Sequence, residues 1–560
     1  MANSAPVGYD CAVPFSTSRA PHRTLATYAR TCSLVAVPLV AAMLVVAGRL
    51  PAQAPPDSGA RARPIIRAVE IHRAPIFDSL EARFWPYRAV NAVHADTRAT
   101  VIRRELLFEA GQPFDTAKVN ESARNLRALG LFQDVTIDSV ATDSGLVVRV
   151  ATTDGWTTGL SLDVKSSGSQ SVFSAGITER NLLGRAAVAT VEYVNDPDRS
   201  AILVGFDVPR VVANAIGIGA SYLDRSDGRA GAANVRYPFY TLSSRRGASL
   251  SGQFVDARVL RFVGGRGFAI DSARHRLEIL RGEAALALVA GPEGYTRLGI
   301  SGQLRRQDFG LERPSPVVDR TVTAALGPFV SVRKPRFIQL RNFQSMGRIE
   351  DVDVGYQLRG SLLAAPRAWG YERDGVGGSL GASVGQRIPS GFVEVQGYAS
   401  ALRSSDQIDS ATVDVSTTVV LQGGERHLAV GHASYGILKD PHPGAEFDLG
   451  LGYAVRAFPS HAFTGDRRFL LNAEYRLLVW PRLLGLVGVG AATFVDHAGA
   501  WYDGARRRTG TDAGVGLRLG SIREAGTVVG RLDLAYRFAS DVEPAGWVVS
   551  IGRGFVFQRF

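Results

Sequence analysis

Residues 531–538 read RLDLAYRF, in which two leucines, a tyrosine and a phenylalanine alternate with charged or small residues. Successive side chains of a β-strand point to opposite faces, so these four apolar side chains would share one face. The same alternation occurs in residues 471–477 (LNAEYRL) and 515–520 (VGLRLG). Runs of about ten such residues, separated by Gly, Pro, Asp and Ser, continue from residue 156 to residue 560. This repeat predicts an all-β region whose strands each have one apolar and one polar face.

The composition suits strands that cross a membrane. Hydrophobic residues make up 46% of the 560 residues and the mean hydropathy is +0.03, which is low for a protein of membrane-spanning helices. Transmembrane barrels have such values because their lipid-facing and lumen-facing residues alternate along each strand. The 61 glycines also suit a curved, closed sheet better than a helical core.

The net charge is +12 and the isoelectric point about 9.9. The excess is mostly arginine and is dispersed along the chain, without a basic helix, a set of zinc ligands or an aromatic RNA-binding signature. Nucleic acid is therefore not expected as a partner. A barrel lumen and anionic lipid headgroups account better for dispersed arginines.

The N-terminus predicts export. Residues 33–48 (SLVAVPLVAAMLVVAG) carry no charge, follow several arginines and precede Ala-Gln-Ala at 52–54. These features are typical of a secretory signal peptide, which we place at residues 1–54, with a linker at 55–63. At 16 residues the apolar run is shorter than the roughly 20 needed to span a bilayer as a helix. Both cysteines, Cys11 and Cys32, lie in this segment, so no disulfide or cysteine zinc site is expected in the mature protein.

Residues 64–154 predict a small α+β domain. An apolar strand at 65–71 precedes helix-like stretches at 98–107 and 115–129, and alternating runs follow at 131–140 and 146–152. An open sheet with both helices on one face would bury the apolar stripe of each helix.

Within this domain, residues 97–137 read TRATVIRRELLFEAGQPFDTAKVNESARNLRALGLFQDVTI. The segment resembles a POTRA domain, the periplasmic module of the Omp85 superfamily (BamA/TamA-like proteins, bacterial surface antigen D15 type). The resemblance implies that residues 155–560 form a C-terminal transmembrane β-barrel of about 16 antiparallel strands in the bacterial outer membrane. It also implies a periplasmic domain that binds unfolded or partner polypeptide by adding a strand to its sheet edge. The alternative is a domain that only packs under the barrel as a plug or gate.

Two segments resemble paired motifs of the same superfamily. Residues 455–458 (VRAF) are similar to its loop-six motif V-R-G-F/Y, and residues 494–498 (FVDHA) are similar to its F-x-D-x-G strand. The resemblance implies that Arg456 enters the lumen and meets Phe494 and Asp496, which would lock the loop inside the barrel. Alanine replaces the family glycine at 457 and at 498. The alternative is that Arg456 and Asp496 are ordinary polar groups of the lumen.

Two more segments match at the ends of the barrel. Residues 177–187 (ITERNLLGRAA) are similar to the motif E-x-N-L-x-G-x-G of early barrel strands, with Glu179, Asn181 and Gly184 matching and Ala186 departing. The last strand resembles an outer-membrane sorting signal and ends in aromatic residues: Trp547, Phe555, Phe557 and Phe560. We expect the first strand (156–164) and the last (547–557) to meet at a weak seam.

These features favour an assembly or insertion factor that templates client strands at the POTRA edge and the barrel seam. The alternatives are a polypeptide-secreting transporter of the two-partner type and a passive outer-membrane barrel. The expected partners are outer-membrane lipid, an unfolded β-barrel client or secreted polypeptide, and a periplasmic partner at the POTRA domain.

No enzymatic activity, catalytic residue, cofactor or metal site is expected. The match to G-x-S-x-G at residues 381–385 lies in an alternating run rather than at a strand-to-helix turn. No zinc-protease motif or Walker loop is present in the sequence.

Overall fold

A computed structural model describes residues 63–560 except 143–144, 168–169, 213–214, 263–268, 312–321, 372, 405–406, 442–443, 525–527 and 558–560. The predicted signal peptide, all but the last residue of the predicted linker, and Phe560 lie outside the described residues. Among the residues that are described, no helix is both long enough and apolar enough to span a bilayer.

The N-terminal domain is a three-stranded sheet with helices, as predicted for a POTRA domain. Its elements are β1 (Ile66–Ala74), α2 (Trp85–Val93), α3 (Ala99–Glu105), α4 (Thr116–Ala128), β2 (Phe132–Thr142) and β3 (Gly145–Asp154). The sheet order is β1-β3-β2, with β1 parallel and β2 antiparallel to β3, so β1 and β2 form its edges.

Helices α3 and α4 supply the core of this domain. Ile102 and Leu126 pack with Phe132 and Val148 in one buried cluster. The Asp115 side chain caps α4 by accepting hydrogen bonds from the backbone N–H of Ala117 and Lys118. Helix α2 was not predicted, because it is short and its aromatic start is exposed, so it has no buried stripe to reveal it.

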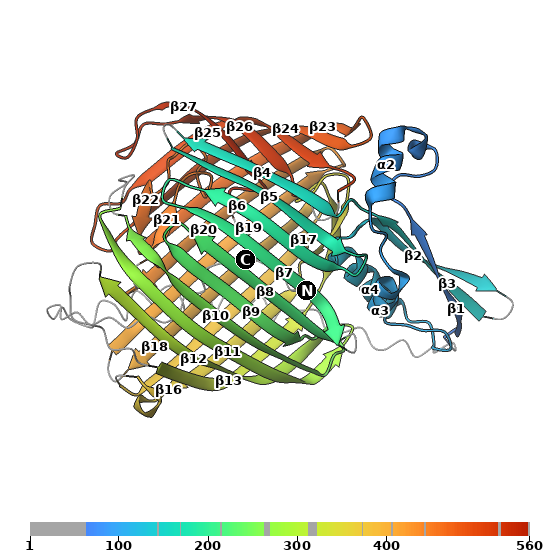
Figure 1. Cartoon of the computed structure of the whole chain (residues 1–560), viewed down its shortest axis with the longest axis horizontal. Helices are drawn as coiled ribbons and strands as arrows, with labels where there is room; N and C mark the ends of the chain where they lie inside the picture. The colour runs from blue at the N-terminus through green and yellow to red at the C-terminus, as the bar shows by residue number, and fades with distance from the viewer. Residues whose placement is uncertain are drawn as a thin grey trace.

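The rest of the chain forms a barrel of twenty antiparallel strands (Figure 1). The strands are β4 (Thr158–Ser167), β5 (Gln170–Leu182), β6 (Ala187–Asn195), β7 (Ser200–Val212), β8 (Ile216–Arg225), β9 (Gly228–Tyr237), β10 (Arg246–Arg261), β11 (Asp271–Gly291), β12 (Gly294–Leu311), β13 (Val322–Lys334), β16 (Tyr356–Ala365), β17 (Gly375–Ile388), β18 (Gly391–Ser404), β19 (Gln407–Gly423), β20 (His427–Lys439), β23 (Arg467–Leu483), β24 (Val487–Trp501), β25 (Thr509–Ser521), β26 (Gly530–Arg537) and β27 (Gly546–Arg553). Each strand pairs with its neighbours along the chain, and β27 lies beside β4.

The expected number of about 16 strands is therefore wrong, although the predicted fold class is confirmed. Many connections are very short: two residues join β11 to β12, and two join β17 to β18. Gly391, after the second of these turns, has φ 156°, and a Cβ there would lie 1.9 Å from the carbonyl oxygen of Val420. Tight glycine turns reduce each strand and its connection to roughly 20 residues, so more strands fit.

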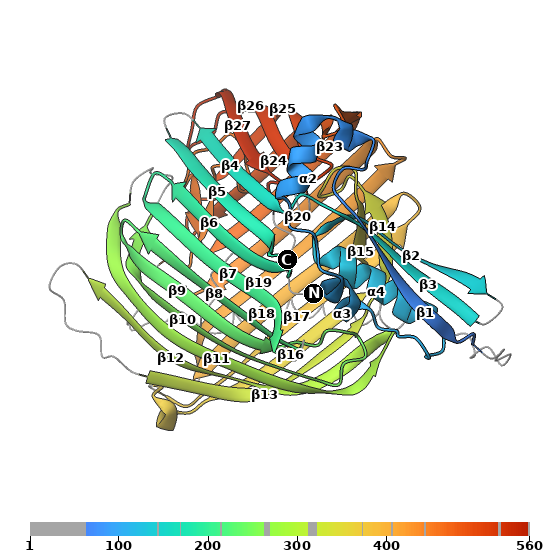
Figure 2. The ribbon, with the colours of Figure 1, turned by 45° about the vertical axis from the view of Figure 1, so that its right-hand side comes forward.

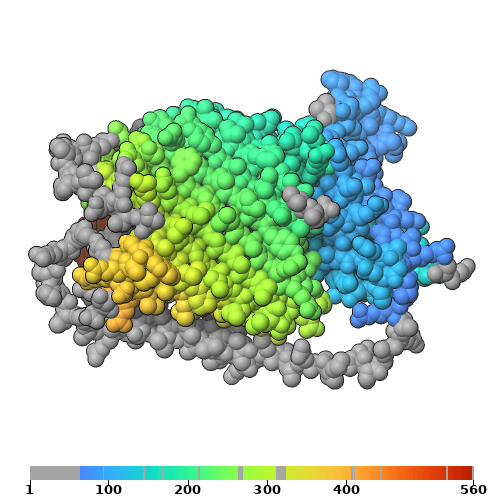
Figure 3. Space-filling view, turned by 60° about the horizontal axis from the view of Figure 1, so that its bottom comes forward, coloured from blue at the N-terminus to red at the C-terminus, as the bar shows by residue number. Residues whose placement is uncertain are grey.

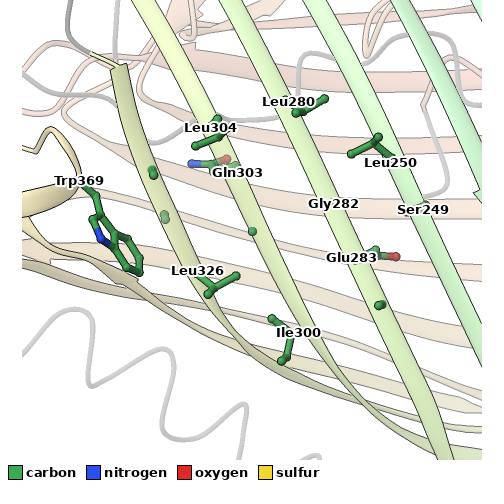
Figure 4. A pocket seen from close by; sticks show the side chains of 14 residues that line it. Ser249, Leu250, Leu280, Gly282, Glu283, Ile300, Gln303, Leu304, Leu326 and Trp369 are labelled. Carbon is green, nitrogen blue, oxygen red and sulfur yellow. The ribbon is translucent and has the colours of Figure 1, made fainter.

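The barrel wall exposes its apolar side chains and buries its polar ones, which is the reverse of the pattern in a soluble protein. On β26, Leu532 and Leu534 are 40% and 43% exposed, whereas Asp533 between them is 1% exposed. Figure 4 shows the same outward apolar surface on β10 to β13, where leucines and Trp369 line a shallow, open hollow. Exposed apolar side chains around a buried polar lumen are typical of a lipid-facing barrel.

The POTRA domain lies across one end of the barrel (Figures 1 and 3). Arg210 of β7 pairs with Glu105 of α3, with 2.8 Å between Nη2 and Oε2. The backbone N–H of Leu242, in the β9–β10 connection, donates to Glu121 of α4 at 2.8 Å. These contacts dock the helical face of the domain on the rim of the barrel.

A hairpin between β13 and β16 packs at the POTRA end of the barrel (Figure 2). It consists of β14 (Phe337–Arg341) and β15 (Ile349–Asp353). Leu340 and Val352 of the hairpin pack with Phe392, Val420 and other strand residues in one buried cluster. On its other side Arg127 of α4 pairs with Asp351, with 2.6 Å between the bonded atoms. The hairpin therefore joins the POTRA domain to the interior of the barrel.

The residues that follow Arg553 turn inward instead of continuing the last strand. Strand β27 ends at Arg553, and Gly554 adopts φ 63°, which redirects residues 554–557, here called the C-terminal tail. Phe555 and Phe557 stack on each other at 5.1 Å, and Phe557 stacks on His432 of β20 at 4.1 Å. The prediction that both phenylalanines belong to the terminal strand is therefore wrong; Trp547 does lie on β27, and its side chain is exposed.

Replacing Phe557 by alanine should lower the free energy of unfolding by about 3–5 kcal/mol, because the ring is buried among the hairpin and strand residues. Urea unfolding of the purified protein, followed by tryptophan fluorescence, measures this change. The control is Phe84→Ala, at an exposed ring of the POTRA domain, which should change the value by about 0.5 kcal/mol or less. Equal effects of the two variants would contradict a packed tail.

Candidate functional site

The connection between β20 and β23 enters the lumen. It carries two short strands, β21 (Phe447–Leu449) and β22 (Phe463–Gly465), and between them residues 450–462, here called the lumen loop. Val455, Ala457 and Phe458 of this loop are completely buried. Leu451, Ala454 and His461 adopt positive φ angles, which fold the loop back on itself.

Arg456 is the centre of this site. Its guanidinium lies 2.9 Å from Asp496 (Nε to Oδ2), and its central carbon lies 3.7 Å from the centroid of the Phe494 ring. The structure thus brings together the three residues that the sequence singled out for the loop. Charge pairing and stacking together satisfy a guanidinium that is only 2% exposed.

Two further carboxylates complete the environment of Arg456. Its Nη2 lies 2.7 Å from Glu474 and its Nη1 lies 3.2 Å from Asp533. Sequence reasoning missed both partners. Their signal was present, since Glu474 lies on the polar face of residues 471–477 and Asp533 on that of residues 531–538.

The acids are shared with other buried arginines. Arg518 contacts Glu474 at 2.8 Å and Asp533 at 2.6 Å. Arg476 contacts Glu474 at 2.5 Å, and Arg531 contacts Asp533 at 3.3 Å. The network spreads charge over several strands, so removing one member leaves others unpaired.

The backbone of the lumen loop is also held by side chains of the wall. Asp512 of β25 accepts from the backbone N–H of Arg456 at 2.9 Å and of Ala457 at 3.0 Å. Arg537 donates to the carbonyl oxygen of Ala457 at 2.9 Å, and Asn472 donates to that of Ala454 at 2.7 Å. These bonds fix the path of the loop as well as its arginine.

The alanines at the two family glycine positions need no left-handed backbone. Ala457 and Ala498 have negative φ, whereas Ala454, two residues before Arg456, has φ 68°. The methyl group of Ala457 packs against Phe494, Ala535 and Val548. The turn that a glycine would favour is therefore displaced to Ala454.

The early-strand motif at residues 177–187 attaches the POTRA domain to the barrel. Asn181 donates to the Thr97 hydroxyl at 2.9 Å and to the carbonyl oxygen of Ala95 at 3.2 Å. Glu179 holds this residue in place by accepting from its backbone N–H at 2.6 Å. The carbonyl oxygen of Gly184 accepts from the backbone N–H of Arg98 at 3.1 Å. A side chain at position 184 would collide with the domain, because its Cβ would lie 2.4 Å from the carbonyl oxygen of Asp96.

The seam between β27 and β4 closes the barrel, and these two strands are hydrogen-bonded neighbours like the other pairs. Across the seam, Arg553 donates to the carbonyl oxygen of Leu160 at 3.2 Å. Trp156, just before β4, donates its backbone N–H to the carbonyl oxygen of Arg523 at 2.8 Å. The residue that leads into β4 is thus held by the β25–β26 connection.

Comparisons with known proteins support the assignment of the N-terminal domain as a POTRA domain. A POTRA family model, described as surface antigen variable number repeat, matches residues 90–163. The outer membrane protein assembly factor BamA of Neisseria meningitidis serogroup B is 29% identical over 140 residues, which is 23% of this chain and 17% of that protein. The chain therefore spans only a small part of that relative's length.

Two solved structures cover most of the chain. BamA from Haemophilus ducreyi lacking POTRA domains 1–3 is 12% identical with a TM-score of 0.34, over 89% of this chain and 86% of that one. CdiB from Escherichia coli is 13% identical with a TM-score of 0.43, over 95% of this chain and 99% of that one. Both TM-scores are low, and neither structural similarity distinguishes an assembly factor from a polypeptide-secreting transporter.

The inverted wall and the POTRA domain at its mouth define an outer-membrane barrel with a periplasmic domain. The chain is an Omp85-type protein with a POTRA domain. It lies in the bacterial outer membrane, and its POTRA domain lies in the periplasm.

Replacing Arg456 by alanine should lower the free energy of unfolding by about 3–5 kcal/mol, because it leaves Glu474, Asp496 and Asp533 buried without their shared cation. Urea titration of the folded protein measures the change. Arg456→Lys should be intermediate, since one ammonium cannot reach three carboxylates. Arg506→Ala, in an exposed turn beyond β24, is the control; a loss equal to the control's would contradict the network.

His461 should make the lumen loop sensitive to pH. Burial lowers the pKa of its imidazole, but the hydrogen bonds that the protonated ring donates to Asp198 at 2.9 Å and to Asp448 at 2.5 Å outweigh this and raise the pKa to about 9 from an ordinary 6.5. Because the folded-state pKa is the higher one, the stabilisation is fully present below pH 6.5 and is lost as the pH rises through 9.

The test compares the melting temperatures of the wild type and of His461→Gln between pH 6 and 10. Their difference should be constant at the acidic end and shrink towards zero around the pKa of about 9. A difference that does not depend on pH would contradict the charged pair.

Proposed function

We propose that the protein inserts client β-strands into the outer membrane, capturing them at an edge of the POTRA sheet and templating them at the β4–β27 seam. The observation that carries this proposal is the seam itself, where the first barrel strand, β4, and the last, β27, are neighbours. No turn joins these two strands, so they can separate without any change in the connections of the chain. Once they separate, their backbone N–H and C=O groups can pair with an incoming strand.

The placement of the POTRA domain supports a path from capture to seam. The domain is attached through Asn181 and Gly184 at the β5–β6 turn, one strand away from β4. The last residues of edge strand β2, 139–142, are exposed and leave room for an added strand. These residues lie at the end of β2 away from Asp154, where β3 leads into the barrel, so a client would be captured outside the barrel mouth and then pass to the seam.

The arginine network would keep the strands on one side of the seam in place while the seam opens. Arg456 binds carboxylates of β23, β24 and β26, all on the β27 side of the seam. In this proposal the network holds these strands together while β4 and β27 separate. Folding of the client supplies the free energy, so no nucleotide is required.

The second candidate is a transporter that secretes polypeptide through the lumen. The lumen loop and the β14–β15 hairpin favour a channel that is gated rather than always open, because both occupy its interior. A transporter would need both to leave the lumen, whereas insertion at the seam leaves them in place. A passive barrel would show a steady open conductance in planar bilayers.

A seam disulfide tests the proposal. The double variant Leu160→Cys/Arg553→Cys places one thiol on β4 and one on β27, at two residues that a side-chain hydrogen bond joins across the seam. Reconstituted in liposomes with an unfolded barrel client, the oxidised variant should lose at least about tenfold of the acceleration of client folding, since the seam can no longer open. A reducing agent should restore it, and a heat-modifiable gel shift measures folding.

The matched control is Leu517→Cys/Leu532→Cys, which links the directly paired residues of β25 and β26 on the same outward face. Its oxidation should leave the rate unchanged. Full activity of the oxidised seam variant would refute templating at the seam. If the wild type does not accelerate folding over empty liposomes, the transporter becomes the better reading for the clients tried.

A further inference from the structure

We propose that the junction between the POTRA domain and the barrel holds a divalent transition-metal ion of the Zn²⁺ class, bound by His94, Asp96 and Asp154. One donor atom of each side chain lies within 4.8 Å of the others. His94 Nε2 and Asp154 Oδ2 are already 3.2 Å apart. Two ligands of a tetrahedral zinc ion, each bound at 2.0–2.1 Å, are separated by about 3.3 Å.

An unsatisfied carboxylate oxygen provides independent support for a ligand. Asp154 Oδ1 is buried and has no hydrogen-bond partner. Its side chain is 4% exposed, and that of His94 is 3% exposed. The other oxygen, Oδ2, accepts from the backbone N–H of Thr97 at 2.8 Å and faces the imidazole. Because a buried charged oxygen without a partner is costly, a cation at this position would remove a real penalty.

The surrounding charge is negative. Glu179 interacts electrostatically with His94 from the barrel side, in addition to Asp96 and Asp154. The nearby arginines are directed elsewhere: Arg73 donates to the carbonyl oxygen of Thr97, and Arg98 donates to that of Leu183. Three carboxylates around one imidazole favour the binding of a dication over an arrangement with the site empty.

The donor set selects the kind of metal. Imidazole nitrogen suits zinc and the later transition metals, whereas Ca²⁺ and Mg²⁺ prefer oxygen ligands throughout. His94 and Asp154 are fixed by burial, and Asp96 is exposed and can rotate to complete the set. Water would fill the remaining coordination position.

The position of the site gives it a structural consequence. His94 and Asp96 lie in the connection between α2 and α3, and Asp154 ends β3, just before the barrel begins. The same connection bonds to Asn181 of β5. A bound ion would link the α2–α3 connection, which contacts Asn181 of the barrel, to the end of β3, which leads into β4. It would therefore restrict the orientation of the POTRA domain relative to the barrel. This inference does not depend on the proposed function.

The binding test uses the full mature chain without an affinity tag, stripped of metal with EDTA and titrated with Zn²⁺ by calorimetry. We expect one high-affinity site per chain. Asp96→Asn should weaken it by about tenfold or more, and His94→Gln by at least as much. Asp96 is exposed, so its variant should fold normally.

The control removes a similar pair that lies outside the site. His72 and Glu70 on β1 face each other at 3.5 Å and are both exposed. His72→Gln should bind Zn²⁺ like the wild type. Equal affinities of Asp96→Asn, His94→Gln and the wild type would overturn the proposal, as would the absence of a high-affinity site. Retention of the site in 1 mM Ca²⁺ should confirm the selectivity, and its loss would overturn the assignment to the zinc class.

A second readout needs no activity. Spin labels at Ser139→Cys on β2 and Thr509→Cys on β25 report the distance between the domain and the barrel. Zn²⁺ should narrow the distance distribution of the otherwise wild-type chain, and it should leave that of the Asp96→Asn chain unchanged. A distribution that does not respond to Zn²⁺ in either chain would refute a metal that restricts the junction.

Discussion

The buried guanidinium of Arg456 places the strongest constraint on the structure. A charge in the dry interior of a barrel is tolerated only when carboxylates and hydrogen bonds replace water around it. Here those groups come from four successive strands: Glu474 from β23, Asp496 from β24, Asp512 through the loop backbone from β25, and Asp533 from β26. One residue of a connecting loop thus aligns four of the twenty wall strands, and the two short strands that flank the loop are placed by the same contacts.

The end of the barrel at which the POTRA domain docks is organised by contacts between segments that are distant in sequence. The β14–β15 hairpin meets α4 through Arg127 and Asp351, and its apolar face packs with the C-terminal tail. The POTRA domain, the hairpin and the tail therefore form one continuous set of contacts at the periplasmic mouth. A displacement of the domain would be transmitted to the interior of the barrel through these side chains.

Much of this organisation could be predicted from the sequence, because alternation fixes which side chains face lipid. The inverted exposure of Leu532 and Asp533 follows directly from the pattern of residues 531–538. The partners of Arg456 could be predicted only where a family motif marks them. Glu474 and Asp533 belong to ordinary polar faces, and which polar residues meet across a lumen depends on strand register, which alternation does not specify.

The errors have different origins. The number of about 16 strands came from the resemblance to the superfamily, whereas the short turns of this chain leave room for twenty. Phe555 and Phe557 follow the spacing of a terminal strand, but the positive φ of Gly554 turns them inward. Local periodicity describes what a segment can form, and its place in the fold is decided by long-range contacts that a single sequence does not display.

The contact between the lumen loop and the end of the chain has a consequence for biogenesis. Ala454 donates through its backbone N–H to the carbonyl oxygen of Val556 at 2.9 Å, and Asp533 belongs to the penultimate strand. Both partners follow the lumen loop in the sequence. The loop therefore cannot take its final position before β26 and the C-terminal tail are in place, so the loop and these later segments must assemble together.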